Sequence, residues 1–259
     1  MQSNREQSRK TFDASADKYD RVRPSYPESL IDEAVRLSEI PVGGRILEIG
    51  CGTGKATELF AARGYTIDCL DIGSDLASIA AAKFTDTQNV QIVVSSFEDW
   101  DPGGGKYDMV IAASSIHWVD PSVRFTKSAS VLHSRGALAV FTNKHVKNEE
   151  GFFRRVQEVY DARAPSMATV TSARKKMWQE PTVGEELFEG PIVRRYPWVT
   201  EYDADEYVAL LGTYSDHLSL PKAERESLFE GVRALICEEY DGRVVKHYEA
   251  VLTLRRLKE

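Results

Sequence analysis

The sequence predicts an α/β protein with a doubly wound, mostly parallel sheet, and three observations support this fold class. Short apolar runs alternate with helical patterns from residue 28 to residue 143. Two of these runs, Met109–Ala113 and Ala137–Phe141, are apolar throughout, which is typical of parallel strands covered by helices on both faces. The segment Gly50–Gly54 carries three glycines directly after the first run, and these turn the chain from a strand into a helix.

The elements before residue 144 follow in a regular order. Residues 1–27 are polar with interspersed aromatics and predict an arm, which ends in the helix-stopping stretch Arg23–Pro27. A helix is expected over 28–40, because apolar residues recur there at helical spacing and Pro41 ends the pattern. Strand, helix, strand, helix, strand, strand, helix and strand then follow, with expected ranges 46–49, 55–63, 66–71, 74–83, 90–94, 107–112, 121–133 and 137–141.

The alternation breaks after Asn143. The C-terminal segment 244–257 alternates apolar and polar residues, which indicates a half-exposed antiparallel strand near a sheet edge. Between these points the sequence predicts helix and loop over 146–190, a strand over 192–199, and helices over 203–211 and 222–239. We expect one domain in four segments, namely an arm (1–27), a core (28–143), a helical and loop cap (144–200) and core-completing helices with the C-terminal strand (201–259).

The composition argues against several classes of protein. A net charge of −7 and a pI near 5.4 disfavour a nucleic-acid partner. The three cysteines are odd in number and lack CxxC spacing, as in reduced thiols of the cytosol. No run approaches ~18 uninterrupted apolar residues, and the N-terminus has no apolar segment. We expect a cytoplasmic protein without a membrane partner, and the scattered histidines predict no metal site.

The glycine-rich stretch Glu48-Ile-Gly-Cys-Gly-Thr-Gly54 is the central motif. A P-loop would need a glycine at position 49 and a hydroxyl at position 56, where the chain has isoleucine and alanine. A dinucleotide fingerprint matches at Gly50 and Gly52, but its third position is Lys55 instead of a small residue. The phosphate-loop interpretation therefore fails, and the dinucleotide interpretation is weakened but stays open.

The residue types of the loop favour a different ligand. Glycines let the main chain approach a ligand closely and adopt positive φ. Glu48 would repel a pyrophosphate, but it can pair with a cation of the ligand. Asp71 ends the next strand about twenty residues on, a position from which a carboxylate accepts both hydroxyls of an adenosine ribose. An adenosine with a positively charged amino-acid tail satisfies all three features.

Glu48–Gly54 together with Asp71 resembles motifs I and II of the class I S-adenosylmethionine (SAM)-dependent methyltransferases. The similarity extends to residues 90–143, and Phe12–Asp20 resembles the start of the small-molecule "type 11" branch, which includes trans-aconitate and quinone-biosynthesis methyltransferases. The resemblance implies a seven-stranded Rossmann-like sheet with a helical cap and an antiparallel C-terminal strand. It also implies in-line methyl transfer to a small-molecule carboxylate or hydroxyl, with S-adenosylhomocysteine as product.

The resemblance implies the cofactor contacts position by position. Ser96 and the Phe97 backbone correspond to the adenine site, the end of the fourth strand faces the methionine part of SAM, and the arm acts as a lid over the SAM carboxylate. The expected cofactor-binding residues are Tyr19, Arg23, Glu48, Gly50, Cys51, Gly52, Gly54, Asp71, Ile72, Ser96, Phe97, Ala112 and Ala113.

Candidate catalytic and substrate residues come from the expected carboxyl edge of the sheet. His117 follows the fourth strand and is either a general base for a hydroxyl acceptor or a structural histidine. Trp118 is either a substrate wall or packing, and Tyr214 either covers the pocket or ends a helix. The basic window 154–176 either binds an anionic substrate or is a solvated helix face. A carboxylate acceptor would need no base.

Two other functions stay open at the level of the sequence. One is an NAD(P)-dependent oxidoreductase, and the other is a non-catalytic SAM-binding protein. A nucleobase acceptor is not expected, because the stretch Ala113–Trp118 contains neither the Asn/Asp-Pro-Pro-aromatic motif nor the Pro-Cys nucleophile of base-modifying enzymes. The expected oligomeric state is a monomer or a homodimer.

Overall fold

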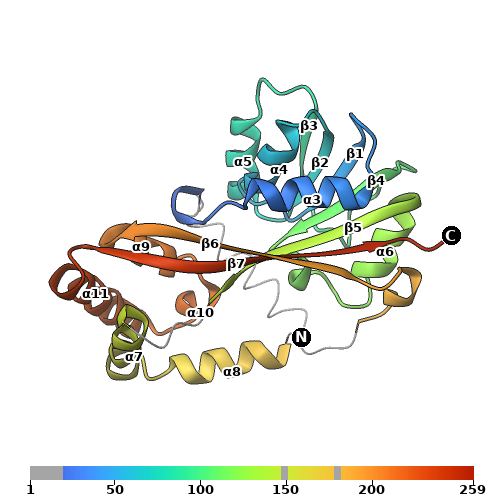
Figure 1. The fold of residues 1–259 in the computed structure, drawn as a ribbon. Coiled ribbons are helices and arrows are strands. Elements are labelled where there is room, and N and C mark those ends of the chain that lie inside the picture. Colours follow the sequence, from blue (N-terminus) through green and yellow to red (C-terminus); the bar gives the residue numbers. More distant parts are fainter. Residues whose placement is uncertain (1–19, 147–150, 178–181) are drawn as a thin grey trace.

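The computed structural model describes residues 20–146, 151–177 and 182–259. Its central feature is a seven-stranded sheet with the strand order β3-β2-β1-β4-β5-β7-β6 (Figure 1). The strands are β1 (Arg45–Ile49), β2 (Thr66–Asp71), β3 (Val90–Val94), β4 (Tyr107–Ala113), β5 (Leu132–His145), β6 (Ile192–Asp203) and β7 (Arg243–Arg256). The helices are α3 (Glu28–Ser38), α4 (Lys55–Ala61), α5 (Ser74–Lys83), α6 (Arg124–Val131), α7 (Gly151–Arg163), α8 (Met167–Met177), α9 (Ala204–Leu211), α10 (Ser215–Leu218) and α11 (Lys222–Glu239), with short 3-10 turns η1 (Ile116–Trp118) and η2 (Glu185–Leu187).

The sheet is parallel from β1 to β5 and antiparallel beyond that point. β1 pairs in parallel with both β2 and β4, β4 pairs in parallel with β5, and β7 pairs antiparallel with β5 and with β6. The strand order therefore reverses between β1 and β4, the point at which open α/β sheets bind ligands at their carboxyl edge. The predicted seven-stranded, mostly parallel fold is confirmed, with β6 as a second antiparallel strand.

The two faces of the parallel strands bury different residues, because side chains alternate along a strand. On β1, Ile46 packs with Leu30 of α3 and Phe60 of α4. Leu47 points to the opposite face, where it packs with Phe125 of α6. By the same alternation Glu48 lies on the side of Ile46, facing α4. This places the acid of the central motif inside the layer between the sheet and α4.

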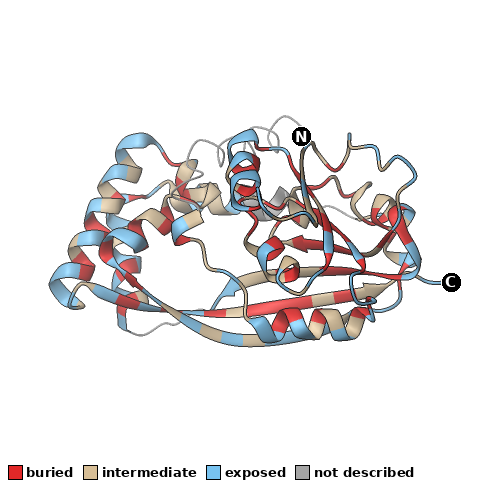
Figure 2. Cartoon of the chain, turned by 90° about the horizontal axis from the view of Figure 1, so that it is seen from above, coloured by how far each residue is buried: buried red, intermediate tan, exposed pale blue. Residues whose placement is uncertain are grey.

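A further hydrophobic cluster lies at one end of the molecule. Helices α7, α9 and α11 gather there around the far ends of β6 and β7 (Figure 1). Phe152 and Val156 of α7 pack with Val208 of α9 and Val232 of α11. The inner faces of these helices are buried and their outer faces exposed (Figure 2). The segments 144–200 and 201–259 share this cluster, so their division stays a prediction.

Three elements differ most from the sequence-based expectation. The helix expected over 121–133 covers only Arg124–Val131, and β5 runs from Leu132 to His145 instead of 137–141. β6 continues to Asp203 instead of residue 199. The long β7 explains the C-terminal extensions, since it pairs with β5 out to His145 and with β6 out to Asp203, whereas Leu132 at the start of β5 pairs with Tyr107 of β4. Backbone hydrogen bonds to a strand that is distant in the sequence stabilise these polar strand ends. The local pattern of apolar and polar residues cannot reveal such pairing.

Within the described ranges, none of the helices combines the length and the apolar character needed to cross a membrane.

Candidate active site

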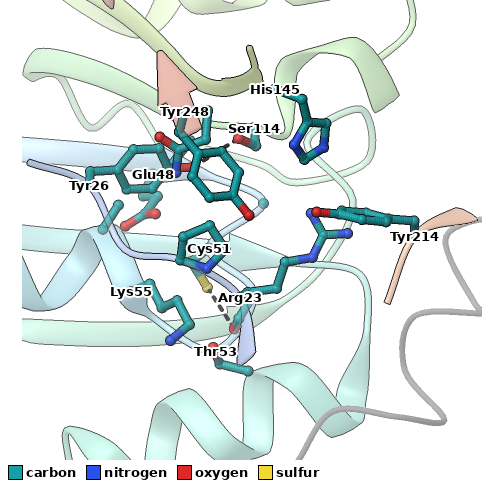
Figure 3. Close-up of a pocket in the computed structure, with 16 residues that line it drawn as sticks. Arg23, Tyr26, Glu48, Cys51, Thr53, Lys55, Ser114, His145, Tyr214 and Tyr248 are labelled. Atoms are coloured by element: carbon teal, nitrogen blue, oxygen red, sulfur yellow. Dashed lines mark hydrogen bonds between the residues drawn. The ribbon is translucent and has the colours of Figure 1, made fainter. Parts of the chain in front are cut away.

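A pocket opens at the carboxyl edge of β1, β4 and β5, next to the glycine-rich loop (Figure 3). It spans about 610 Å³ of space between atoms, part of which is open solvent. The described residues that line it are Arg23, Pro24, Tyr26, Glu48, Gly50, Cys51, Gly52, Thr53, Lys55, Ala56, Ala113, Ser114, Asn143, His145, Tyr214 and Tyr248.

The glycine loop forms one wall of the pocket because its backbone has a shape that only glycine adopts easily. Gly50, Gly52 and Gly54 have φ of 68°, 57° and 81°, in the left-handed region. The loop is also crowded, since a Cβ on Gly50 would lie 2.6 Å from the Ser115 Cβ, and one on Gly54 2.5 Å from the Phe84 ring. The main chain therefore faces the pocket without side chains in its way.

Glu48 is fully buried and lines the pocket at the start of this loop. Thr57 of α4 donates a hydrogen bond of 2.7 Å to its Oε2, while Oε1 has no hydrogen-bond partner. Burial raises the pKa of Glu48 to about 8; the nearby Asp71 charge also raises it, and the Thr57 bond opposes the shift. An orphaned carboxyl oxygen in a buried place is costly, and it fits an ammonium group brought by a ligand.

Asp71 holds the loop from the end of β2. Its Oδ2 accepts the Gly52 N–H at 2.7 Å and its Oδ1 accepts the Gly73 N–H at 2.8 Å. The side chain is 8% exposed and points inward to the loop. Asp71 is not among the pocket-lining residues, and its ribose role stays a prediction.

Residues within 20–27, the part of the arm that the structure describes, line the pocket from another side. The Arg23 guanidinium donates to Thr213 Oγ1 at 2.8 Å and to the Thr213 carbonyl at 2.6 Å, and it lies 4.4 Å from the Tyr214 ring centroid. Tyr26 shares a 2.9 Å hydrogen bond with Ser114 Oγ. Ser114 has a φ of 59°, a conformation that costs a non-glycine residue energy and is frequent at functional sites.

The pocket contains part of the predicted site. Arg23, Glu48, Gly50, Cys51, Gly52, Ala113 and Tyr214 line it. The Cys51 thiol stays protonated, because its hydrogen bond with Cys69 and its burial both raise its pKa. Gly54 supports the loop from the N-terminus of α4. Tyr19 lies outside the described residues.

Other predicted residues lie away from the pocket lining. The Ser96 hydroxyl donates a hydrogen bond of 2.7 Å to the nearby Asp99 Oδ2. Ile72 is 40% exposed, whereas Phe97 and Ala112 are buried in the core. His117 and Trp118 form the half-buried turn η1, with ring centroids 4.8 Å apart. Their predicted roles stay predictions.

The sequence-based reasoning missed several residues that converge on the pocket. Asn143 and His145 lie at the end of β5, Tyr248 lies opposite His145 on β7, and Tyr26 comes from the arm. Asn143 and His145 follow a predicted strand, so their place at the carboxyl edge was a usable signal. Tyr248 had no such signal, because its approach depends on the antiparallel pairing of a distant strand. Among the described residues, no group of three or more His, Cys, Asp or Glu is placed to hold a metal ion.

Comparison with known proteins agrees with this geometry. Residues 46–136 match the family described as methyltransferase domain. A probable S-adenosylmethionine-dependent methyltransferase of Saccharomyces cerevisiae is 33% identical over 127 residues, which cover 47% of this chain and 43% of that protein. Malonyl-acyl-carrier-protein O-methyltransferase 1 of Ilyobacter polytropus is 33% identical over 100 residues, 38% of this chain and 37% of that protein. The chain thus matches less than half the length of each of these two relatives.

A solved structure shows the same fold across nearly the whole chain. It is phosphoethanolamine N-methyltransferase 2 of Haemonchus contortus, in complex with phosphomonomethylethanolamine and S-adenosylhomocysteine. The TM-score is 0.53 with 12% identity, over 95% of this chain and 58% of that one. At this identity the likeness concerns the fold alone.

The resemblance to class I SAM-dependent methyltransferases is therefore confirmed. The chain contains a methyltransferase domain at residues 46–136, set in a Rossmann-like fold of the methyltransferase type.

Proposed function

We propose that this protein is a SAM-dependent methyltransferase that methylates an oxygen of a small molecule. The observation that carries the proposal is the buried, orphaned Oε1 of Glu48 beside the glycine loop. A pyrophosphate at this place would meet a carboxyl group, whereas an amino-acid ammonium would satisfy it. The methyltransferase-domain match and the name of the yeast relative support the proposal.

The residues present fit SAM as the cofactor. Gly50 and Gly52 both have positive φ, and a Cβ on Gly50 would collide with Ser115; Glu48 would hold the amino group of the methionine part. Asp71 fixes the Gly52 and Gly73 amides and would accept the ribose hydroxyls. SAM supplies an activated methyl group on a sulfonium when bound.

The chain's own task is then binding, alignment and the exclusion of water. The tie between Arg23 and Thr213, together with the Tyr26–Ser114 bond, holds the arm across the pocket. Because the methyl group is already activated, no nucleophilic side chain is required. The proposal of an oxygen acceptor is supported by the O-methyltransferase name of the relative from Ilyobacter polytropus. We also propose a cytoplasmic location, supported by three cysteines that are all free.

Isothermal titration calorimetry with S-adenosylhomocysteine and with NAD tests the cofactor. We expect micromolar or tighter binding of S-adenosylhomocysteine and no heat with NAD. Binding of NAD in its place would overturn the proposal in favour of an oxidoreductase. Detection of S-adenosylhomocysteine during turnover with small carboxylates and phenols separates an enzyme from a protein that only binds SAM.

A further inference from the structure

Four rings line the pocket, and we call them the aromatic wall: Tyr26, His145, Tyr214 and Tyr248 (Figure 3). The His145 ring lies 5.3 Å from the Tyr214 ring and 5.4 Å from the Tyr248 ring, measured between centroids. His145 lines the pocket and is also exposed to solvent.

Surrounding contacts hold the aromatic wall in place. Tyr248 shares a 3.2 Å hydrogen bond with the Tyr202 hydroxyl and stacks on Trp198 at 5.2 Å. Tyr214 packs on the His217 ring at 5.7 Å and under the Arg23 guanidinium. Rings that are fixed before a ligand arrives lose little entropy on binding. The wall is therefore prepared to receive a flat group.

The two described cationic side chains that line the pocket, Arg23 and Lys55, are both engaged with protein groups, so neither is arranged to bind a carboxylate of the substrate. Among the described lining residues, the Arg23 guanidinium donates twice to Thr213. Lys55 lies 3.8 Å from the Asp20 carboxylate. A free carboxylate acceptor would have to compete for these groups, whereas an aromatic ring can pack against the faces and edges of the wall.

Among the rings of the aromatic wall, His145 is the one best placed to accept a proton. Burial raises the pKa of Tyr214 and Tyr248, so both hydroxyls keep their protons at neutral pH. Glu48 lies beside the glycine loop, where the proposed cofactor amine would engage it. The His145 imidazole lines the pocket and is exposed to solvent, so it can pass a proton from the pocket to water.

We propose, on the basis of the proposed function, that the acceptor is a small aromatic compound with a hydroxyl group and that His145 is its general base. The acceptor oxygen forms a bond to the methyl carbon while the carbon–sulfur bond breaks and its electron pair stays on sulfur. The hydroxyl proton passes to the His145 imidazole and from there to solvent. Atoms and charge balance, since a sulfonium and a neutral hydroxyl give a thioether, a methyl ether and one proton.

A binding experiment tests the proposal without turnover. The full chain is saturated with S-adenosylhomocysteine and titrated with 4-nitrophenol slightly below neutral pH, where the free phenol is mostly colourless. We expect binding together with a rise in the yellow phenolate absorption, because the imidazole accepts the proton. His145→Gln should still bind S-adenosylhomocysteine but lose the absorption change. His133→Gln, at the other end of β5, is the matched control and should behave as wild type.

Turnover with 4-nitrophenol provides the second measurement. His145→Gln should lower kcat by about 10²–10⁴-fold, with a much smaller change in the KM for the phenol. If His145→Gln shows the same rise in phenolate absorption as wild type, His145 is not the proton acceptor and the proposal is overturned. So does a wild-type complex that neither binds nor methylates the phenol, or a loss of kcat in His117→Gln alone.

The two proposals fail in different ways. If S-adenosylhomocysteine does not bind to wild type, the proposed function fails. If it binds but 4-nitrophenol does not, only the aromatic acceptor and the role of His145 fail. Unchanged affinity of His145→Gln for S-adenosylhomocysteine shows that the variant is folded.

Discussion

The glycine loop and the aromatic wall, which both line the pocket, are built in different ways. The first is made of the contiguous residues 48–54 and the end of β2, and it is fixed by backbone bonds such as those from Gly50 and Cys51 to the Leu70 carbonyl. The second brings together Tyr26, His145, Tyr214 and Tyr248, which are far apart in the sequence and held by side chains.

This difference suits a glycine loop that keeps one cofactor and an aromatic wall that changes with the acceptor. A loop of strained glycines tolerates few substitutions, because both its φ angles and its neighbours are restrictive. Each ring of the wall can be exchanged without disturbing the loop. One fold can therefore keep one cofactor and change its acceptor.

Substitutions in the two regions should then have separable effects. Four substitutions test this, and they follow in order of decreasing expected effect.

The largest effect is expected for Gly50→Ala. A methyl group there would lie 2.6 Å from the Ser115 Cβ at a φ of 68°. Gly43 is a matched control, since its φ is 71° with nothing within 4 Å of the added Cβ. Urea unfolding should show a loss of about 1–2 kcal/mol for Gly43→Ala and about 1–3 kcal/mol more for Gly50→Ala. Equal losses would show that the loop has room to move.

The second effect concerns pH and Glu48. Its pKa is about 8 in the folded protein, raised by burial from the ordinary 4.5. Between these values only the folded state binds the proton, so the free energy of unfolding falls as pH rises, by at most about 1.4 kcal/mol per pH unit. The stabilisation is complete below 4.5 and lost above about 8. Glu48→Gln should flatten this slope in urea titrations at several pH values, and parallel curves for the two proteins would contradict the assignment.

The third effect is on cofactor affinity. Asp71→Asn puts an amide where carboxylate oxygens accept the Gly52 and Gly73 N–H groups. We expect calorimetry to show S-adenosylhomocysteine binding weakened by about 1–3 kcal/mol, since charge-assisted hydrogen bonds are lost. Asp86→Asn, an exposed site beyond α5, should leave the affinity as it is. An unaltered affinity in Asp71→Asn would rule out the ribose role.

The smallest effect lies behind the aromatic wall. Tyr160 shares a 2.6 Å hydrogen bond with His217 Nε2, and the His217 ring packs on Tyr214. Tyr160→Phe should lower stability by about 1 kcal/mol without weakening S-adenosylhomocysteine binding. Tyr240→Phe removes a hydroxyl with no hydrogen bond among the described residues and should cost less. A clear loss of cofactor affinity in Tyr160→Phe would mean that the glycine loop and the aromatic wall are coupled.

The sequence by itself determined the parallel half of the fold and the glycine-loop part of the site. The positions of Glu48, Gly50 and Gly52 on the pocket were predictable, because each lies in one strand–turn–helix unit where local spacing fixes its place. The alternation of apolar runs and helices likewise reflects local periods.

Only the tertiary structure decided what faces the cofactor across the pocket. His145 and Tyr248 meet because β5 and β7 pair in one antiparallel register, and Tyr26 reaches Ser114 only once the arm crosses the sheet edge. Such contacts depend on hydrogen bonds between segments that are distant in the sequence. No repeating pattern of residue types marks them. The placement of His145, and not His117, on the pocket has the same cause.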